Sequence, residues 1–221
     1  MNALATILAA LVGGVIGSLG AQWLGERYRR AQSAEAMRRE VATRHLVQLQ
    51  DALVSLWFRI DNLVNQAGRS VMTSDYFELS SAYVLANFLA QKRLLVIEGA
   101  YANLAVFGEA FSSELGASLE QLDEAFGRGF EGASFHRYQR QALGELLIRW
   151  DGRWRVFTYT EFVQLAKHPS TALAVEPAVL FLKQLDSSRG DPILATSGDL
   201  IERVGTATGL PIPEAILSRE A

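Results

Sequence analysis

Three histidines, His45, His136 and His168, are the side chains of this sequence best suited to bind a metal ion or to transfer a proton near neutral pH. A helical metal site needs a second histidine or a carboxylate three or four residues further along, and none of the three has one. No Glu-x-x-His pair of the kind found in di-iron bundles occurs either. We interpret each histidine as an ordinary polar residue. The alternative is an inter-helix site that combines one histidine with Glu98 or Glu145.

Other catalytic motifs are missing or lack their structural context. The chain has no cysteine, which excludes thiolate nucleophiles and cysteine-based zinc sites. Residues 127–132 match the spacing G-x-G-x-x-G, but no strand precedes them, so we expect a loop. The carboxylates Glu114, Glu120, Asp123 and Glu124 are interpreted as a solvated helix face, with a cation site or a basic partner as the alternative. The sequence thus predicts no catalytic residue, no cofactor and no metal, and a protein that is not an enzyme.

The first structural element of the chain is an apolar segment. From Ala3 to Leu24 there is no charged side chain, and 22 residues of helix extend about 33 Å, enough for a hydrocarbon core of about 30 Å. The chain as a whole has 221 residues and a hydrophobic fraction of 49%, which suits one domain with one span. The alternatives are a cleaved signal peptide, which normally has a positive start and a shorter apolar run, and a helix lying on the membrane surface.

Arginines follow the apolar segment directly, at Arg27, Arg29 and Arg30. The positive-inside rule therefore places the N-terminus outside and the body of the protein in the cytoplasm. Each of these arginines can also interact with anionic lipid headgroups, contributing about 1 kcal/mol near the membrane surface. A plain topology signal is the alternative, and both roles can hold together. The net charge of −3 and the absence of a basic stripe argue against a nucleic-acid partner.

Small residues recur every four positions within the apolar segment. This predicted helix-packing face consists of Ala5, Ala9, Gly13, Gly17, Ala21 and Gly25. A stripe of small side chains allows another helix to approach closely, as in G-x-x-x-G pairs. The pattern predicts association with a second copy of the chain or with another membrane subunit. The alternative is that alanine and glycine are simply common in membrane helices.

The fold class predicted from periodicity is all-α. We expect a single N-terminal transmembrane helix that continues into the long first helix of a five- or six-helix cytoplasmic bundle. The predicted organisation is a membrane anchor over residues 1–25, a basic helical stalk over 26–45, the bundle over 46–208 and a tail over 209–221.

Helix breakers and apolar spacing give approximate boundaries within the body. The expected helices cover about residues 3–67, 76–107, 115–126, 134–150, 160–167, 177–186 and 191–207. Residues 153–159 alternate as a strand would, but no partner strand is evident. We therefore interpret them as an extended connector.

Two short motifs resemble those of an uncharacterised family of bacterial helical proteins of unknown function. Residues 139–145 read Gln-Arg-Gln-Ala-Leu-Gly-Glu, and residues 159–162 read Tyr-Thr-Glu-Phe, after an aromatic-rich helix over 83–98. The resemblance covers roughly residues 46–186. It implies one helical domain and no known activity. The predicted span, in a bacterial protein, gives an expected location in the inner (cytoplasmic) membrane, with a single pass.

The function predicted from these features is that of a single-pass, membrane-anchored interaction or scaffold protein, an accessory subunit of a homo-oligomeric or larger membrane complex. Its expected partners are the lipid bilayer and, through the transmembrane helix, itself or another membrane subunit. The alternative is a membrane-tethered, ligand-sensing regulator with a helical cytoplasmic domain. An enzyme with an unrecognised site is the least favoured alternative. It stays open because helical bundles can assemble sites from scattered carboxylates.

Overall fold

A computed structural model describes residues 2–65, 75–127 and 135–218, with side chains from residue 26 onward apart from Asp75 and Glu109. The chain divides into two compact units, Met1–Glu40 and Val41–Ala221. The helices are α1 (Asn2–Val64), α2 (Asp75–Ile97), α3 (Ala100–Asn103), α4 (Glu109–Gly127), α5 (Arg137–Leu146), α6 (Tyr159–Ala166), α7 (Pro169–Lys183), α8 (Ser187–Thr208) and α9 (Glu214–Leu217), with a 3-10 turn η1 (Leu104–Phe107) and strands β1 (Ile148–Trp150) and β2 (Trp154–Val156). The prediction of a mostly helical chain is confirmed.

The membrane prediction is not shown by the structure. Among the residues that it describes, no helix is both long enough and apolar enough to cross a membrane. The anchor predicted over residues 3–24 falls where side chains are outside the description, so the transmembrane helix stays a prediction.

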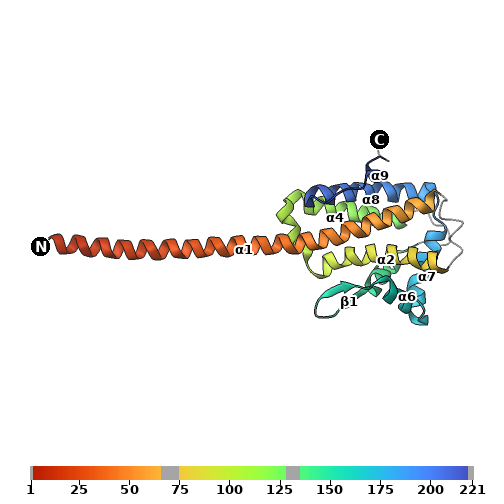
Figure 1. Ribbon diagram of the computed structural model, residues 1–221, viewed down its shortest axis with the longest axis horizontal. Helices are drawn as coiled ribbons and strands as arrows, with labels where there is room; N and C mark the ends of the chain where they lie inside the picture. The colour runs from red at the N-terminus through yellow and green to blue at the C-terminus, as the bar shows by residue number, and fades with distance from the viewer. Residues whose placement is uncertain (1, 66–74, 128–134, 219–221) are drawn as a thin grey trace. The chain divides into compact units, whose positions relative to one another are not determined.

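The second unit is built around the C-terminal part of α1. Its apolar residues Leu46, Leu49, Leu53, Leu56 and Ile60, spaced three or four apart, are all fully buried, as the sequence pattern predicted. Within this unit α2 lies on one side of α1, and α4 and α8 lie on the other (Figure 1). The helices α5, α6 and α7 and strand β2 pack against α2.

Phenylalanines join four parts of the second unit in its core. Phe126 of α4 lies 6.1 Å from Phe88 of α2 and 5.8 Å from Phe181 of α7, measured between ring centroids. Phe135, just before α5, lies 5.5 Å from Phe181. Edge-to-face and tilted ring pairs of this kind add to the free energy gained from burying their area.

The helix expected over residues 76–107 is interrupted. It ends at Ile97, because Gly99 takes the left-handed conformation with φ 61°, and the chain restarts as α3 and η1. Glycine adopts positive φ without the steric cost that a Cβ brings, so this position acts as a stop inside an otherwise helical run.

The extended connector expected over residues 153–159 is instead half of a β-hairpin, and the expected helix over 134–150 ends at Leu146. Strand β1 pairs antiparallel with β2, with Ile148 opposite Val156 and Trp150 opposite Trp154. Gly152 supplies the positive φ, 73°, that the tight turn requires. Its partner strand is residues 148–150, which the sequence analysis assigned to the preceding helix.

Two later helices begin earlier than their prolines suggested. Pro169 starts α7 and does not stop α6, whereas Pro177 and Pro192 lie inside α7 and α8. Each internal proline removes a donor for the carbonyl four residues before it. Those residues, Leu173 and Ser188, are exposed, so water can hydrogen-bond to the carbonyls.

The predicted tail is partly ordered against the second unit. The short helix α9 buries Ile216, and the side-chain amide of Gln50 on α1 donates to the Pro211 carbonyl at 3.2 Å. Residues 209–218 therefore belong to the packed domain.

Candidate functional site

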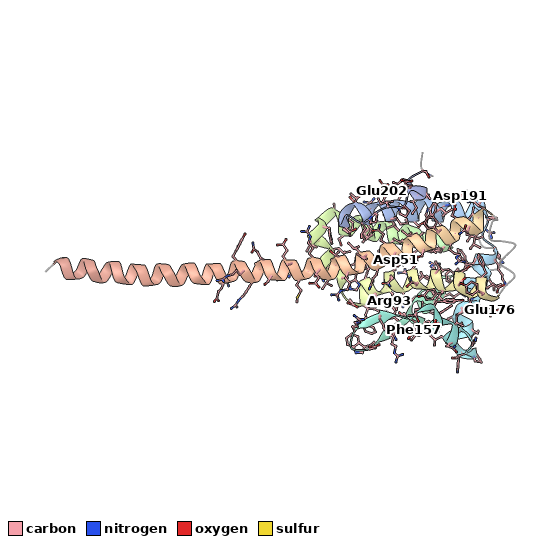
Figure 2. The ribbon with its side chains drawn as sticks, in the orientation of Figure 1. Asp51, Arg93, Phe157, Glu176, Asp191 and Glu202 are labelled. Carbon is pink, nitrogen blue, oxygen red and sulfur yellow. The ribbon has the colours of Figure 1, made fainter. Side chains whose placement is uncertain are left out.

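A solvent-open cleft of about 550 Å³ lies between two polar helix stripes and the β-hairpin. Its volume is within the range of about 300–1,000 Å³ typical of small-molecule sites. The stripe on α1 is Arg44, Gln48 and Asp51, and the stripe on α2 is Tyr83, Asn87 and Gln91. Spacings of three and four residues place each stripe on one side of its helix. Figure 2 labels Asp51 on α1 and Phe157 beyond β2, which line two walls of this cleft.

His45 and Glu98 connect the two helices at the cleft. The His45 Nε2 atom lies 3.1 Å from a carboxylate oxygen of Glu98, and the His45 side chain is only 5% exposed. One of the pairings left open by the sequence is thus present as a hydrogen bond. Among the described residues no group of three potential ligands is gathered for a metal ion, so the pair alone is not a metal centre.

Two residues that line the cleft each have a polar atom with no hydrogen-bond partner in the described part of the chain. The Nδ1 atom of His45 and the Oε1 atom of Gln91 are both buried without a hydrogen bond. Leaving a buried polar atom unpaired costs about 1–3 kcal/mol, and such groups in native proteins call for an explanation.

The β-hairpin supplies an aromatic wall. Trp150 and Trp154 face each other across the strands with ring centroids 5.1 Å apart, and both line the cleft with Phe157. The Tyr83 hydroxyl donates to the Phe157 carbonyl at 3.1 Å and attaches the hairpin to α2. Burial, with a smaller contribution from the charge of Glu161, raises the pKa of Tyr83 above its ordinary value.

An ion pair holds the base of the hairpin to α6. Arg155 donates to both carboxylate oxygens of Glu161, at 2.8 and 2.9 Å, and to Asp151 at 3.0 Å. The hydrogen bonds from Arg155 and then from the Thr158 backbone lower the pKa of Glu161 to about 2. Glu161 also completes a capping box, because Thr158 is the N-cap of α6 and bonds to it in both directions.

A second charged cluster corrects one sequence-based interpretation. Glu114, Glu120 and Glu124 are exposed as predicted, but Asp123 is not part of a solvated face. It bonds to Arg140 and lies 3.1 Å from Lys92, and its side chain is 15% exposed. Burial by itself would raise the pKa of Asp123, but the hydrogen bond from Arg140 and the charges of Lys92 and Arg140 lower it below its ordinary value. This cluster pairs one carboxylate with two cations and connects α2, α4 and α5.

The other residues that the sequence analysis singled out do not line the cleft. Arg27, Arg29 and Arg30 are exposed on α1 in the first unit, where Arg30 also contacts Glu26 at 3.4 Å. His168 caps α7 and His136 is exposed just before α5. The predicted packing face has side chains outside the described part of the chain: Ala5, Ala9, Gly13, Gly17, Ala21 and Gly25.

Sequence reasoning missed the amides of the cleft. Tyr83, Asn87 and Gln91 recur every four residues in a helix that is otherwise apolar nearly all round, and this polar stripe was the available signal. No role was assigned to this stripe from the sequence. The matching stripe on α1 was less visible, because polar residues are expected on the solvent-facing side of any amphipathic helix.

Comparison of the chain with protein-family models, curated proteins and solved structures gives no match. The chemistry of the cleft therefore has to be argued from its own residues. It combines hydrogen-bond donors, acceptors and aromatic surface, which is the composition of a binding site for a small polar molecule.

Proposed function

We propose that this chain is a membrane-tethered regulator whose second unit, residues 41–221, binds a small polar molecule in the cleft between α1, α2 and the hairpin. The observation that carries the proposal is the set of three side-chain amides, Gln48, Asn87 and Gln91, that line one cleft opposite the aromatic hairpin and have no hydrogen bond to any described residue. Amides that line an open cleft can donate hydrogen bonds to a polar ligand and accept them from it. The tether is the predicted helix over residues 3–24.

A ligand screen by thermal unfolding tests the proposal on the full-length chain in mild detergent. A ligand at 100 times its Kd stabilises the folded state by about 2.7 kcal/mol. For a chain of this size that corresponds to an increase in Tm of roughly 5–10 °C. We expect one class of small polar molecule to give a saturable increase that is reduced in Gln91→Leu. Saturable binding that is identical in the variant would place the site elsewhere.

The tether has its own test. Alkaline carbonate extraction leaves integral proteins in the membrane pellet, and we expect the chain to stay there. Release into the supernatant would contradict the transmembrane helix while leaving the ligand site open to the thermal screen.

An interaction or scaffold subunit is the second candidate function. It is favoured by the small-residue stripe around Gly13 and Gly17 and by the exposed leucines of α7, Leu173 at 78% and Leu180 at 43% exposure. Copurification from mild detergent separates the two functions. A stoichiometric partner without any ligand-dependent change in Tm would support the scaffold.

A further inference from the structure

The cleft presents three carboxamides with no hydrogen bond to any described residue: Gln48 on α1 and Asn87 and Gln91 on α2. Each carboxamide offers two N–H donors and one carbonyl acceptor. A ligand that satisfies them must therefore donate and accept hydrogen bonds. Phosphates and carboxylates only accept, and ammonium groups only donate, so neither matches this set of partners.

The charges that line the cleft nearly cancel. Three arginines, Arg44, Arg153 and Arg155, and two carboxylates, Asp51 and Glu98, line it. Arg155 is also paired with Glu161 and Asp151. Within the described part of the chain, Asp51 and Arg153 have no ion pair, and their charges are opposite. A site that selects a charged ligand normally supplies an excess of the opposite charge, because a charge removed from water without a counter-charge is costly. The charge balance favours a ligand with no net charge.

The hairpin wall requires an apolar surface on the same ligand. Trp150 is 60% exposed, and Trp154 and Phe157 are half-buried beside it. Indole rings contribute a large, flat apolar area and lose little conformational entropy on binding. The ligand must therefore present an apolar face to the rings and hydroxyl or amide groups to the helix stripes. A pyranose ring does both, because its faces are covered with C–H groups and its edge carries hydroxyls that donate and accept.

We infer, on the basis of the proposed function, that the cleft binds a neutral carbohydrate of about disaccharide size. Its hydroxyls pair with Gln48, Asn87 and Gln91, and one face of a sugar ring stacks on Trp154. The cleft of about 550 Å³ leaves space for two linked rings.

Isothermal titration calorimetry with maltose, lactose and cellobiose, each added to the full-length chain in a maltoside-free detergent, tests the inference. Uridine, the dipeptide Gly-Phe and inorganic phosphate are the comparison probes. We expect saturable binding of at least one disaccharide and of none of the comparison probes. Loss of one hydrogen bond in Gln91→Leu or Gln48→Leu is expected to weaken binding about 10-fold, and loss of the stacked ring in Trp154→Ala at least as much.

Gln164→Leu is the matched control, because Gln164 is exposed on α6 and does not line the cleft. It should bind the disaccharide as the parent chain does. Gln48 is itself exposed, so its variant tests the site even if Trp154→Ala fails to fold.

Binding that survives all three cleft substitutions would overturn the inference. Binding of uridine or Gly-Phe in place of any disaccharide would overturn the carbohydrate class but support the ligand-binding function. If no probe binds, the carbohydrate is excluded, and the broader thermal screen then decides the proposed function separately.

Discussion

Arg140 donates two hydrogen bonds to the carboxylate of Asp123, from Nε at 3.2 Å and from Nη2 at 2.9 Å. The Arg140 side chain is 7% exposed, and it also donates to the Phe135 carbonyl. Removing one member of a buried ion pair leaves the other charge uncompensated. We expect Asp123→Ala to lower the free energy of unfolding by about 3 kcal/mol, measured by urea denaturation followed by circular dichroism.

Glu114→Ala is the matched control for that measurement. Glu114 also pairs with an arginine, Arg203, and comes from the same helix, but its side chain is 54% exposed. Exposed pairs contribute about 0–1 kcal/mol, so this variant should be close to the parent chain. Equal losses in the two variants would show that burial of the Asp123 cluster adds nothing to stability.

The Arg155–Glu161 pair makes the stability of the folded state depend on pH in the acidic range. The pKa of Glu161 falls from its ordinary value of about 4.5 to about 2 in the folded chain, so the folded state holds the ionised carboxylate more strongly than the unfolded state does. The stabilisation is fully present above pH 4.5 and is lost as the pH falls towards 2. We expect Glu161→Gln to lower Tm at pH 7 and to flatten the decrease in Tm between pH 4.5 and pH 2. Glu176→Gln, which alters an exposed carboxylate on α7 labelled in Figure 2, should leave the profile unchanged.

Gly144 marks the closest crossing of α5 over α2. A Cβ at this position would lie 2.9 Å from the Leu89 carbonyl carbon and 3.0 Å from its oxygen, and these backbone atoms cannot move aside freely. We expect Gly144→Ala to destabilise the chain by about 1–3 kcal/mol through overpacking. Gly116→Ala, in the open part of α4 with nothing within 4 Å, should be neutral or stabilise by about 0.5–1 kcal/mol. Thermal unfolding of the two variants measures the contrast, which would be absent if α5 could shift without cost.

We expect association through the predicted anchor to depend on Gly13 and Gly17. Replacing Gly13 and Gly17 together with isoleucine fills the narrow part of the small-residue stripe and should abolish copurification of a second copy or a membrane partner. Size-exclusion chromatography in detergent, combined with crosslinking in membranes, measures the change. A double variant that associates like the parent chain would mean that the stripe does not pack against another helix.

Periodicity predicted the helices that bury one regular face. The spacing of Leu46, Leu49 and Leu53 placed the correct side of α1 in the core, and Leu115 and Leu119 did the same for α4. These patterns are local, because burial of one helix face leaves a mark every three or four residues. Boundaries set by a single backbone angle, such as the break at Gly99, leave no such mark.

The cleft was not predictable in the same way. Asn87 and Gln91 come from one helix, Gln48 and Asp51 from another, and the tryptophans from a hairpin whose first strand had been assigned to a helix. Which polar side chains meet is decided by the packing of distant segments, and spacing within one segment does not encode it. His45 and Glu98 illustrate the limit: 53 residues separate them, and the sequence could only offer Glu98 as one of two possible partners.

The two tryptophans of the hairpin have an optical consequence. Trp150 and Trp154 hold their indole rings 5.1 Å apart and 66° from parallel. Transitions of two chromophores fixed so close together couple, and the coupling gives a paired positive and negative band in the far-ultraviolet circular dichroism spectrum. Both rings line the cleft, so we expect a molecule that stacks on one of them to change their mutual angle and the intensity of the couplet. If the proposed ligand binds, this couplet measures its binding without a label.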